Sequence, residues 1–230
     1  MNRLLVIPIA AAIALFSCAK EEDNQNETTN TGSSSDNTET PVEEGLVLNI
    51  EEKQNALLFN YTSTGCPGCG SWGKPSFEQL SSEFEGDVVP LEIHIKYGDP
   101  FITDESQAIA DNRTGDRYTP QLRVDNENAM MRTESGALSG GLSLTQARTL
   151  IQDHTAENPV ASCGSVFELS DSTITVKYGA EFHEDVTGEY YIVAYILESD
   201  VNASQSGDDI SGEVPHSHVI RQAVTADEFG

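Results

Sequence analysis

The stretch Tyr61-Thr-Ser-Thr-Gly-Cys-Pro-Gly-Cys-Gly-Ser-Trp72 decides the fold predicted for this chain. An apolar run at residues 56–59 leads into it, and a helix predicted over 69–84 leads out. Cys66 and Cys69 therefore lie where a strand passes into a helix N-terminus. Unpaired N–H groups and the positive end of the helix dipole favour a thiolate there, the form of cysteine that attacks disulfides. The two-residue spacer allows Cys69 to resolve a mixed disulfide formed by Cys66.

The segments around the dithiol alternate between strand and helix patterns. In the predicted strand 88–96, Leu91 and Ile93 point to one face, and Glu92 and His94 point to the other. His94 is interpreted as an ordinary exposed or hydrogen-bonded side chain, with an influence on a nearby thiolate as the alternative. The remaining elements are predicted strands at 46–50, 56–61, 118–124 and 129–131 and predicted helices at 101–113 and 143–157.

The order of these elements is strand, strand, dithiol, helix, strand, helix, Thr119-Pro120, strand, turn, strand and helix. This order resembles the α/β thioredoxin fold, and the resemblance covers residues 45–157. It implies that Thr119 and Pro120 form a cis-proline loop, which lies against the dithiol and binds the substrate chain through backbone groups. The sequence departs from that family at Gly65, where an aromatic residue is usual, at the Pro-Gly spacer, and at Asn60, which replaces a buried acid. These departures leave the reduction potential open.

Other chemistries for the dithiol fit the sequence less well. A structural zinc site needs four ligands, and there is one CxxC motif, with Cys163, His216 and His218 remote in sequence. Haem attachment needs a His directly after the second Cys, where Gly70 stands. A fixed structural disulfide between Cys66 and Cys69 stays open as an alternative, since disulfides persist in exported proteins.

Residues 158–230 have a different character. Strands are predicted at 165–169, 173–178, 189–197 and 214–224, with Gly, Asp and Ser turns between them. The expected fold is an antiparallel β-sandwich of immunoglobulin-like type, which usually has seven strands. Because four strands are visible and the chain ends within the last, we expect a truncated sequence or a domain that lacks strands. His216 and His218 are interpreted as surface polar groups rather than a metal pair, and Cys163 as a buried free thiol.

The N-terminus has the features of an export and anchoring signal. An apolar run of about a dozen residues follows Arg3, which suits a signal peptide and is shorter than the roughly 20 residues that span a bilayer. The run ends in Leu15-Phe-Ser-Cys18, which resembles a bacterial lipobox. The resemblance implies cleavage after residue 17 and lipidation of Cys18. Residues 18–44 begin with an acidic cluster that resembles a surface-export signal, and their polar composition is typical of a disordered tether.

The charge of the chain excludes one class of partner. It carries 12 Lys and Arg against 38 Asp and Glu, a formal net charge of −26. Nucleic acid would be repelled by this charge, so no nucleic-acid partner is expected. The layout as a whole resembles the Bacteroidota outer-membrane lipoproteins related to a twenty-eight-kilodalton outer-membrane protein, on residues 15–18, 62–69, 88–94 and 218–221. That resemblance implies a location in the cell envelope, facing the surface or the periplasm, and supplies an architecture more than an activity.

Two functional hypotheses follow. In the first, the protein is a membrane-anchored thiol-disulfide oxidoreductase in which Cys66 is the nucleophile, Cys69 resolves the mixed disulfide, and Thr119 and Pro120 hold the substrate. Its partners would be cysteine-containing exported proteins and a redox partner. In the second, it is a surface binding or adhesion lipoprotein, whose thioredoxin-like scaffold is inactive and whose Cys66–Cys69 disulfide is structural. Neither hypothesis requires a cofactor or a metal ion.

Overall fold

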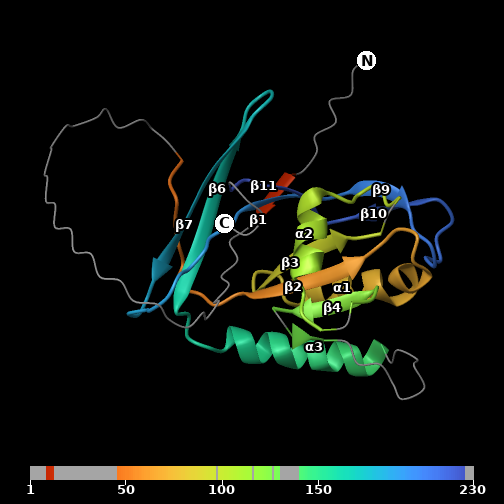
Figure 1. Ribbon diagram of the computed structural model, residues 1–230, viewed down its shortest axis with the longest axis horizontal. Helices are drawn as coiled ribbons and strands as arrows, with labels where there is room; N and C mark the ends of the chain where they lie inside the picture. Colours follow the sequence, from red (N-terminus) through yellow and green to blue (C-terminus); the bar gives the residue numbers. More distant parts are fainter. Residues whose placement is uncertain are drawn as a thin grey trace, which may run out of the picture.

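The computed structural model describes residues 9–12, 46–96, 98–115, 117–125, 127–129 and 140–225, and it shows a mixed α/β protein (Figure 1). A sheet of seven strands lies at its centre, in the order β1-β8-β11-β3-β2-β4-β5. The strands of this sheet are β1 (Ile9–Ala12), β2 (Ala56–Thr62), β3 (Val88–His94), β4 (Gln121–Val124), β5 (Glu127–Asn128), β8 (Tyr195–Glu198) and β11 (Val219–Ala223). The predicted α/β character is therefore confirmed.

Strands β2 and β3 form the parallel centre of the sheet. They pair in register from Ala56 opposite Val88 to Thr62 opposite His94. Nearly every residue of both strands is buried, which accounts for their almost continuous apolar sequences. Strand β4 runs antiparallel to β2 on its other side, and β5 returns beside β4 as a short hairpin.

Helices cover both faces of the sheet. A short π-helix, η1 (Cys69–Gly73), continues directly into α1 (Lys74–Glu83), in agreement with the helix predicted over 69–84. On one face, α1 and α3 (Gly140–Thr155) bury Phe77, Leu80 and Ile151 against Leu58 of β2. On the other face, α2 (Asp104–Asn112) packs Ile109 against Ile93. Thr103 and Ser106 form a capping box at the start of α2.

The β-sandwich expected over residues 158–230 is wrong for the strands that the structure describes. Strands β8 and β11 join the central sheet, and β11 runs parallel to β3 with Val219 opposite Glu92. Leu197 and Ile220 enter the same core cluster as Ile93. The physical reason is that an apolar strand needs cover on both faces, and the edge of β3 supplies a sheet in which β8 and β11 obtain it.

The other strands of this region form two separate antiparallel pairs. A long hairpin consists of β6 (Ala161–Leu169) and β7 (Ile174–Phe182), and Figure 1 shows it as the pair of long arrows away from α1. A shorter pair, β9 (Val201–Ser204) and β10 (Glu213–His216), is here called the β9–β10 ribbon. The strand predicted over 189–197 is therefore reduced to β8, and the one predicted over 214–224 is divided into β10 and β11.

Two further predictions differ from the structure at the N-terminal side. Residues 46–50 form no strand, and Leu48 and Ile50 instead contact the β6–β7 hairpin where Gly164 and Gly179 leave room. Strand β1 pairs with β8 although it lies inside the predicted signal peptide. Met130 and Met131 of the predicted return strand 129–131 lie outside the described residues. Within the described residues, no helix has the length and apolar character needed to cross a membrane.

Candidate functional site

Cys66 and Cys69 form a disulfide between the end of β2 and the start of η1. Their Cα atoms are 5.2 Å apart. The backbone N–H of Cys69 donates to Sγ of Cys66 at 3.3 Å, and it also donates to the Cys66 carbonyl at 3.0 Å. A helix N-terminus thus points an N–H group at the sulfur of Cys66, where it would stabilise a thiolate.

Pro120 lies against the same turn of helix. The Thr119–Pro120 peptide is cis, as the resemblance implied. A Cβ atom added at Gly68 would lie 3.2 Å from Cδ of Pro120, and one added at Gly73 would lie 3.0 Å from its Cγ. The proline ring is therefore in van der Waals contact with both ends of the segment that carries Cys69.

The disulfide is almost completely shielded from solvent. The exposed fraction is 5% for Cys66 and 0% for Cys69. The cover is the turn 205–208, which joins β9 to β10. The side-chain amide of Gln205 points at the carbonyls of Ser63 and Thr64 at 3.2 Å and of Cys66 at 3.3 Å, and the Ser206 N–H donates to the Thr64 carbonyl at 2.8 Å.

Two glycines allow this cover to approach so closely. A Cβ atom on Gly70 would collide with the backbone of Ser206 and Asp208, and one on Gly207 would collide with the backbone of Pro67. Gly207 also has a φ of +80°, which side chains with a Cβ rarely adopt. The turn therefore lies directly on the Pro67-Gly68 spacer between the two cysteines.

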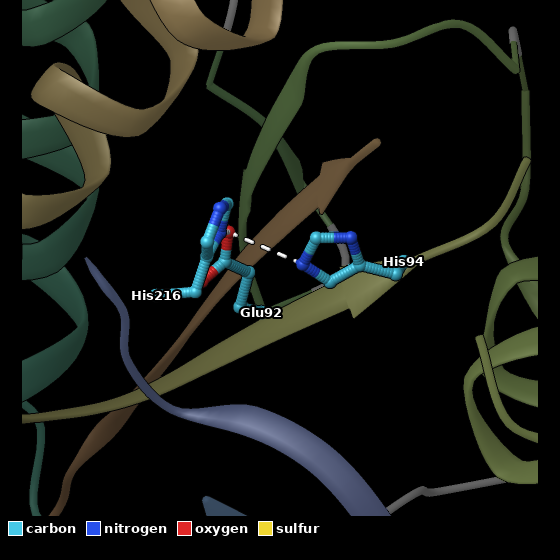
Figure 2. A group of neighbouring side chains, drawn as sticks. All are labelled: Glu92, His94 and His216. Carbon is cyan, nitrogen blue, oxygen red and sulfur yellow. Dashed lines mark hydrogen bonds and ion pairs between the residues drawn. The ribbon is translucent and has the colours of Figure 1, made fainter. Parts of the chain in front are cut away.

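A second group of polar side chains lies buried beside this site. Glu92 and His94 point from β3, His216 points from the end of β10, and Figure 2 shows the Glu92 carboxylate between the two imidazole rings. Oε1 of Glu92 is 3.2 Å from Nδ1 of His216 and 3.4 Å from Nε2 of His94. None of the three side chains is more than 2% exposed. We call these three residues the Glu–His–His cluster.

Asp99 connects this cluster to the disulfide loop. Its Oδ2 is 3.0 Å from Nδ1 of His94 and accepts a hydrogen bond of 2.7 Å from the N–H of Thr64, two residues before Cys66. The ring of Phe101 packs on the rings of His94 and His216 with centroid distances of 4.9 and 5.1 Å. The cluster therefore packs against the ring of Phe101 on one side, and on another side Asp99 connects it by hydrogen bonds to the loop that carries Cys66.

The charges of the cluster support one another. Burial would raise the pKa of Glu92, but hydrogen bonds from His216 and His94 outweigh burial and lower the pKa to about 2. Burial would lower the pKa of His94, but its interactions with the carboxylates of Asp99 and Glu92 outweigh burial and raise the pKa to about 9. Burial would also raise the pKa of Asp99, and its bonds to His94 and to the backbone lower it instead. Near pH 7 the structure therefore favours an anionic Glu92 and Asp99 beside a cationic His94.

Sequence reasoning did not assemble this cluster. It interpreted His94 as an exposed or hydrogen-bonded side chain, and the bond to Asp99 agrees with the second interpretation. It placed His216 on the surface, which is wrong because the ring is fully buried. The resemblance suggested that no buried acid is present because Asn60 replaces it, but Glu92 lies directly beside Asn60 in the sheet register. The available signal was the alternation Glu92-Ile93-His94 in a strand that is apolar on both sides, since such a strand buries both of its faces.

His216 and His218 do not form a pair. The ring of His218 packs edge-on against Phe77, with a centroid distance of 6.2 Å. Together with Glu92, it lines a pocket of about 470 Å³ beside α1. Burial lowers the pKa of His218. The two histidines therefore face different surroundings, although one residue separates them.

Comparison with protein-family models, with curated proteins and with solved structures gave no match for this chain. The function must therefore be argued from the residues and geometry described above.

Cys163 is the free cysteine of the described residues, and it lies on β6 at intermediate exposure. Burial raises the pKa of its thiol to about 12. Because the thiolate is the reactive form, we expect iodoacetamide at pH 8 to label Cys163 about 1,000-fold more slowly than an ordinary exposed cysteine. The rate should rise about tenfold per pH unit until the pH nears that pKa.

This expectation is measured by mass spectrometry on a Cys18→Ser variant with the disulfide oxidised, in which Cys163 is the one remaining thiol. The same variant unfolded in urea is the control and should label at the ordinary rate. Equal labelling rates for the folded and unfolded chains would show that the Cys163 thiol is not shielded by the fold.

Proposed function

We propose that this protein is an exported thiol-disulfide oxidoreductase, with Cys66 and Cys69 as the reacting pair on a thioredoxin-like domain spanning residues 45–157. The observation that carries the proposal is the Cys69 N–H directed at Sγ of Cys66 at a helix N-terminus. This arrangement lowers the free energy of a Cys66 thiolate, which a purely structural disulfide does not need. The cis-peptide loop at Pro120 beside the same turn adds support.

The reaction proceeds by two exchanges. In the reduced protein, the Cys66 thiolate attacks one sulfur of a substrate disulfide, the substrate S–S bond breaks, and one substrate thiolate leaves. The Cys69 thiolate then attacks Sγ of Cys66, which breaks the mixed disulfide and releases the second substrate thiolate. Substrate gains two electrons and the Cys66–Cys69 disulfide is restored, so a redox partner with a dithiol must reduce it again. Thr119 and Pro120 would hold the substrate chain beside Cys66.

Access to Cys66 requires movement of the turn 205–208. The β9–β10 ribbon that carries it is a two-stranded element, a kind that is marginally stable alone. The turn meets the disulfide loop through hydrogen bonds from Gln205 and Ser206, while the apolar contacts of the ribbon lie in β9, where Ala203 packs with Phe101 and Val219. Local opening of such an element costs less free energy than global unfolding, so the closed structure is compatible with a working dithiol.

The proposal also places the protein in the cell envelope. The lipobox-like sequence ending in Cys18 supports a lipid anchor in the outer membrane, with residues 18–44 as the tether and cysteine-containing exported proteins as substrates. The acidic cluster after Cys18 resembles a surface-export signal, so the anchored protein would face either the cell surface or the periplasm. Cleavage after residue 17 would remove β1 and leave the edge of β8 uncovered.

A second function is favoured by one observation, the burial of both sulfur atoms. In this alternative, Cys66–Cys69 is a structural disulfide that fixes the loop under the β9–β10 ribbon. The protein would then be a surface binding or adhesion lipoprotein, with its contacts made elsewhere.

The reduction potential of the pair separates the two functions. The measurement uses the full chain with Cys18→Ser and Cys163→Ser, so that Cys66 and Cys69 are the remaining cysteines, equilibrated in glutathione or dithiothreitol buffers. We expect a value in the range of working oxidoreductases, roughly −120 to −270 mV. A value below about −300 mV, typical of structural disulfides, would reject the oxidoreductase and support the binding lipoprotein.

A further inference from the structure

We propose that the Glu–His–His cluster is a binding site for one divalent metal ion of the zinc class, held by Glu92, His94 and His216. The three side chains offer one carboxylate oxygen and two imidazole nitrogens, and these ligand atoms lie within 4.8 Å of one another. The metal ion would displace the proton from His94, because a histidine ligand binds in its neutral form. Imidazole and carboxylate are the ligands that zinc uses together in sites with three protein ligands. The cysteines supply none of the ligands, so metal binding can be tested with the disulfide kept oxidised and without relying on the proposed redox function.

The distances between the ligand atoms fit a tetrahedral ion. Two ligands at the usual zinc bond lengths of about 2.0–2.1 Å, in a tetrahedral arrangement, are about 3.3 Å apart. Oε1 of Glu92 lies 3.2 Å from Nδ1 of His216 and 3.4 Å from Nε2 of His94, so both of these pairs match that spacing. The nitrogens of the two imidazole rings lie within 4.8 Å of each other, and they would move together to hold the ion.

Unpartnered polar atoms gather at this place. Nε2 of His94 makes no hydrogen bond and faces Oε1 of Glu92 at 3.4 Å, and Nε2 of His216 is buried without a hydrogen-bond partner. The same is true of both side-chain polar atoms of Asn60 and of Oγ1 of Thr62, which the register places beside Glu92 and His94. Five of the six such atoms in the described part of the chain belong to these four residues. Since buried polar atoms in folded proteins nearly always have a hydrogen-bond partner, the patch has the character of a site for a polar ligand.

A carboxylate holds the ring of His94 from behind, as is usual for histidines that bind a metal ion. Nδ1 of His94 faces Oδ2 of Asp99 at 3.0 Å, which leaves Nε2 directed at Glu92 (Figure 2). A carboxylate behind a histidine ligand fixes the ring and raises its basicity, and this arrangement is common at zinc sites. Asp99 is itself held by the N–H groups of Thr64 and Phe101.

A pocket beside α1 offers a route by which an ion could reach the cluster. Glu92 lines the pocket of about 470 Å³ that also contacts Lys74, Phe77 and His218. An ion could reach the carboxylate from this pocket. Three protein ligands leave a fourth position of a tetrahedral ion for water, the arrangement of a reactive rather than a structural zinc.

The test uses Zn²⁺ and Co²⁺ alone as probes on the full chain, freed of metal by a chelator and with the disulfide kept oxidised. We expect one ion per chain by competition with a chromophoric chelator, and a rise in the thermal unfolding midpoint on adding Zn²⁺. His94→Gln and His216→Gln should weaken binding at least 100-fold, and Asp99→Asn about 10–100-fold. His183→Gln is the matched control, because His183 bonds to Ser162 outside the cluster, and its affinity should be unchanged.

Two results would overturn the proposal. One is the absence of binding to the folded chain, and the other is equal affinity in the His94→Gln, His216→Gln and His183→Gln variants. If the cluster variants do not fold, the absorption spectrum of the unaltered chain with Co²⁺ decides instead. Intense visible bands without a sulfur-to-cobalt charge-transfer band support a tetrahedral nitrogen and oxygen site, whereas a charge-transfer band or weak octahedral bands reject it.

Discussion

The Glu92→Leu variant is expected to lose about 3–5 kcal/mol of its free energy of unfolding, measured in urea with a chelator present. Leucine removes the one carboxylate that faces both His94 and His216. His94 keeps Asp99 as a partner, but its Nε2 and the Nδ1 of His216 would face a methyl group at a fully buried position. The substitution is destabilising because it removes one partner of a buried, charged group and leaves the remaining polar atoms buried without a partner.

A carboxylate in a surface ion pair supplies the control for this experiment. Glu83 at the end of α1 pairs with Arg148 of α3 at 2.8 Å, and its side chain is 39% exposed. Glu83→Leu is expected to change the free energy of unfolding by less than about 1 kcal/mol. If Glu92→Leu were as mild as Glu83→Leu, the cluster would contribute nothing to stability and its charges would have to be reassigned.

The Gly207→Ala variant is expected to accelerate reduction of the Cys66–Cys69 disulfide by a small thiol about 10–100-fold. The added Cβ would meet the backbone of Pro67, and the φ of +80° is unfavourable for alanine. Overpacking of this kind costs about 1–3 kcal/mol, which shifts the equilibrium of the turn 205–208 toward an open state by about that fold-change. The rate is followed with dithiothreitol and gel-shift labelling of the released thiols.

Gly212 provides a matched comparison within the same ribbon. Its φ is +123°, but a Cβ there would meet nothing within 4 Å. Gly212→Ala thus adds a similar backbone strain without the collision with Pro67, and it should reduce at the rate of the unaltered chain. Equal rates for all three proteins would mean that the turn does not limit access to the disulfide.

The parts of this fold that sequence reasoning predicts well depend on local signals. The apolar run before Cys66 is β2. The helical spacing of Phe77 and Leu80 is confirmed because both lie on the buried face of α1. The placement of the two cysteines at a strand-to-helix junction is also confirmed, because β2 ends at Thr62 and η1 begins at Cys69. Each of these features is settled by residues within about one helix length of one another.

The parts that sequence reasoning missed depend on pairing between distant segments. Nothing near Val219 in the chain indicates that it will lie beside Glu92, because strand order in a sheet is not encoded in the periodicity of a single strand. The Pro215-His-Ser-His218 sequence has the pattern of a polar strand start, but His216 within it is buried where β10 leads into β11 of the central sheet. The Glu–His–His cluster and the cover over Cys66 both arise from this one topological feature.

The long separation between the disulfide and its cover also implies an order of events during folding. Cys66 and Cys69 are three residues apart, so they can pair as soon as that short segment meets an oxidant. Gln205, which closes over them, lies 139 residues further along the chain than Cys66. Contacts across such a separation form later and more slowly than local ones. The pair can therefore be oxidised before its cover forms, and once the cover is in place any further exchange has to wait for the turn 205–208 to open.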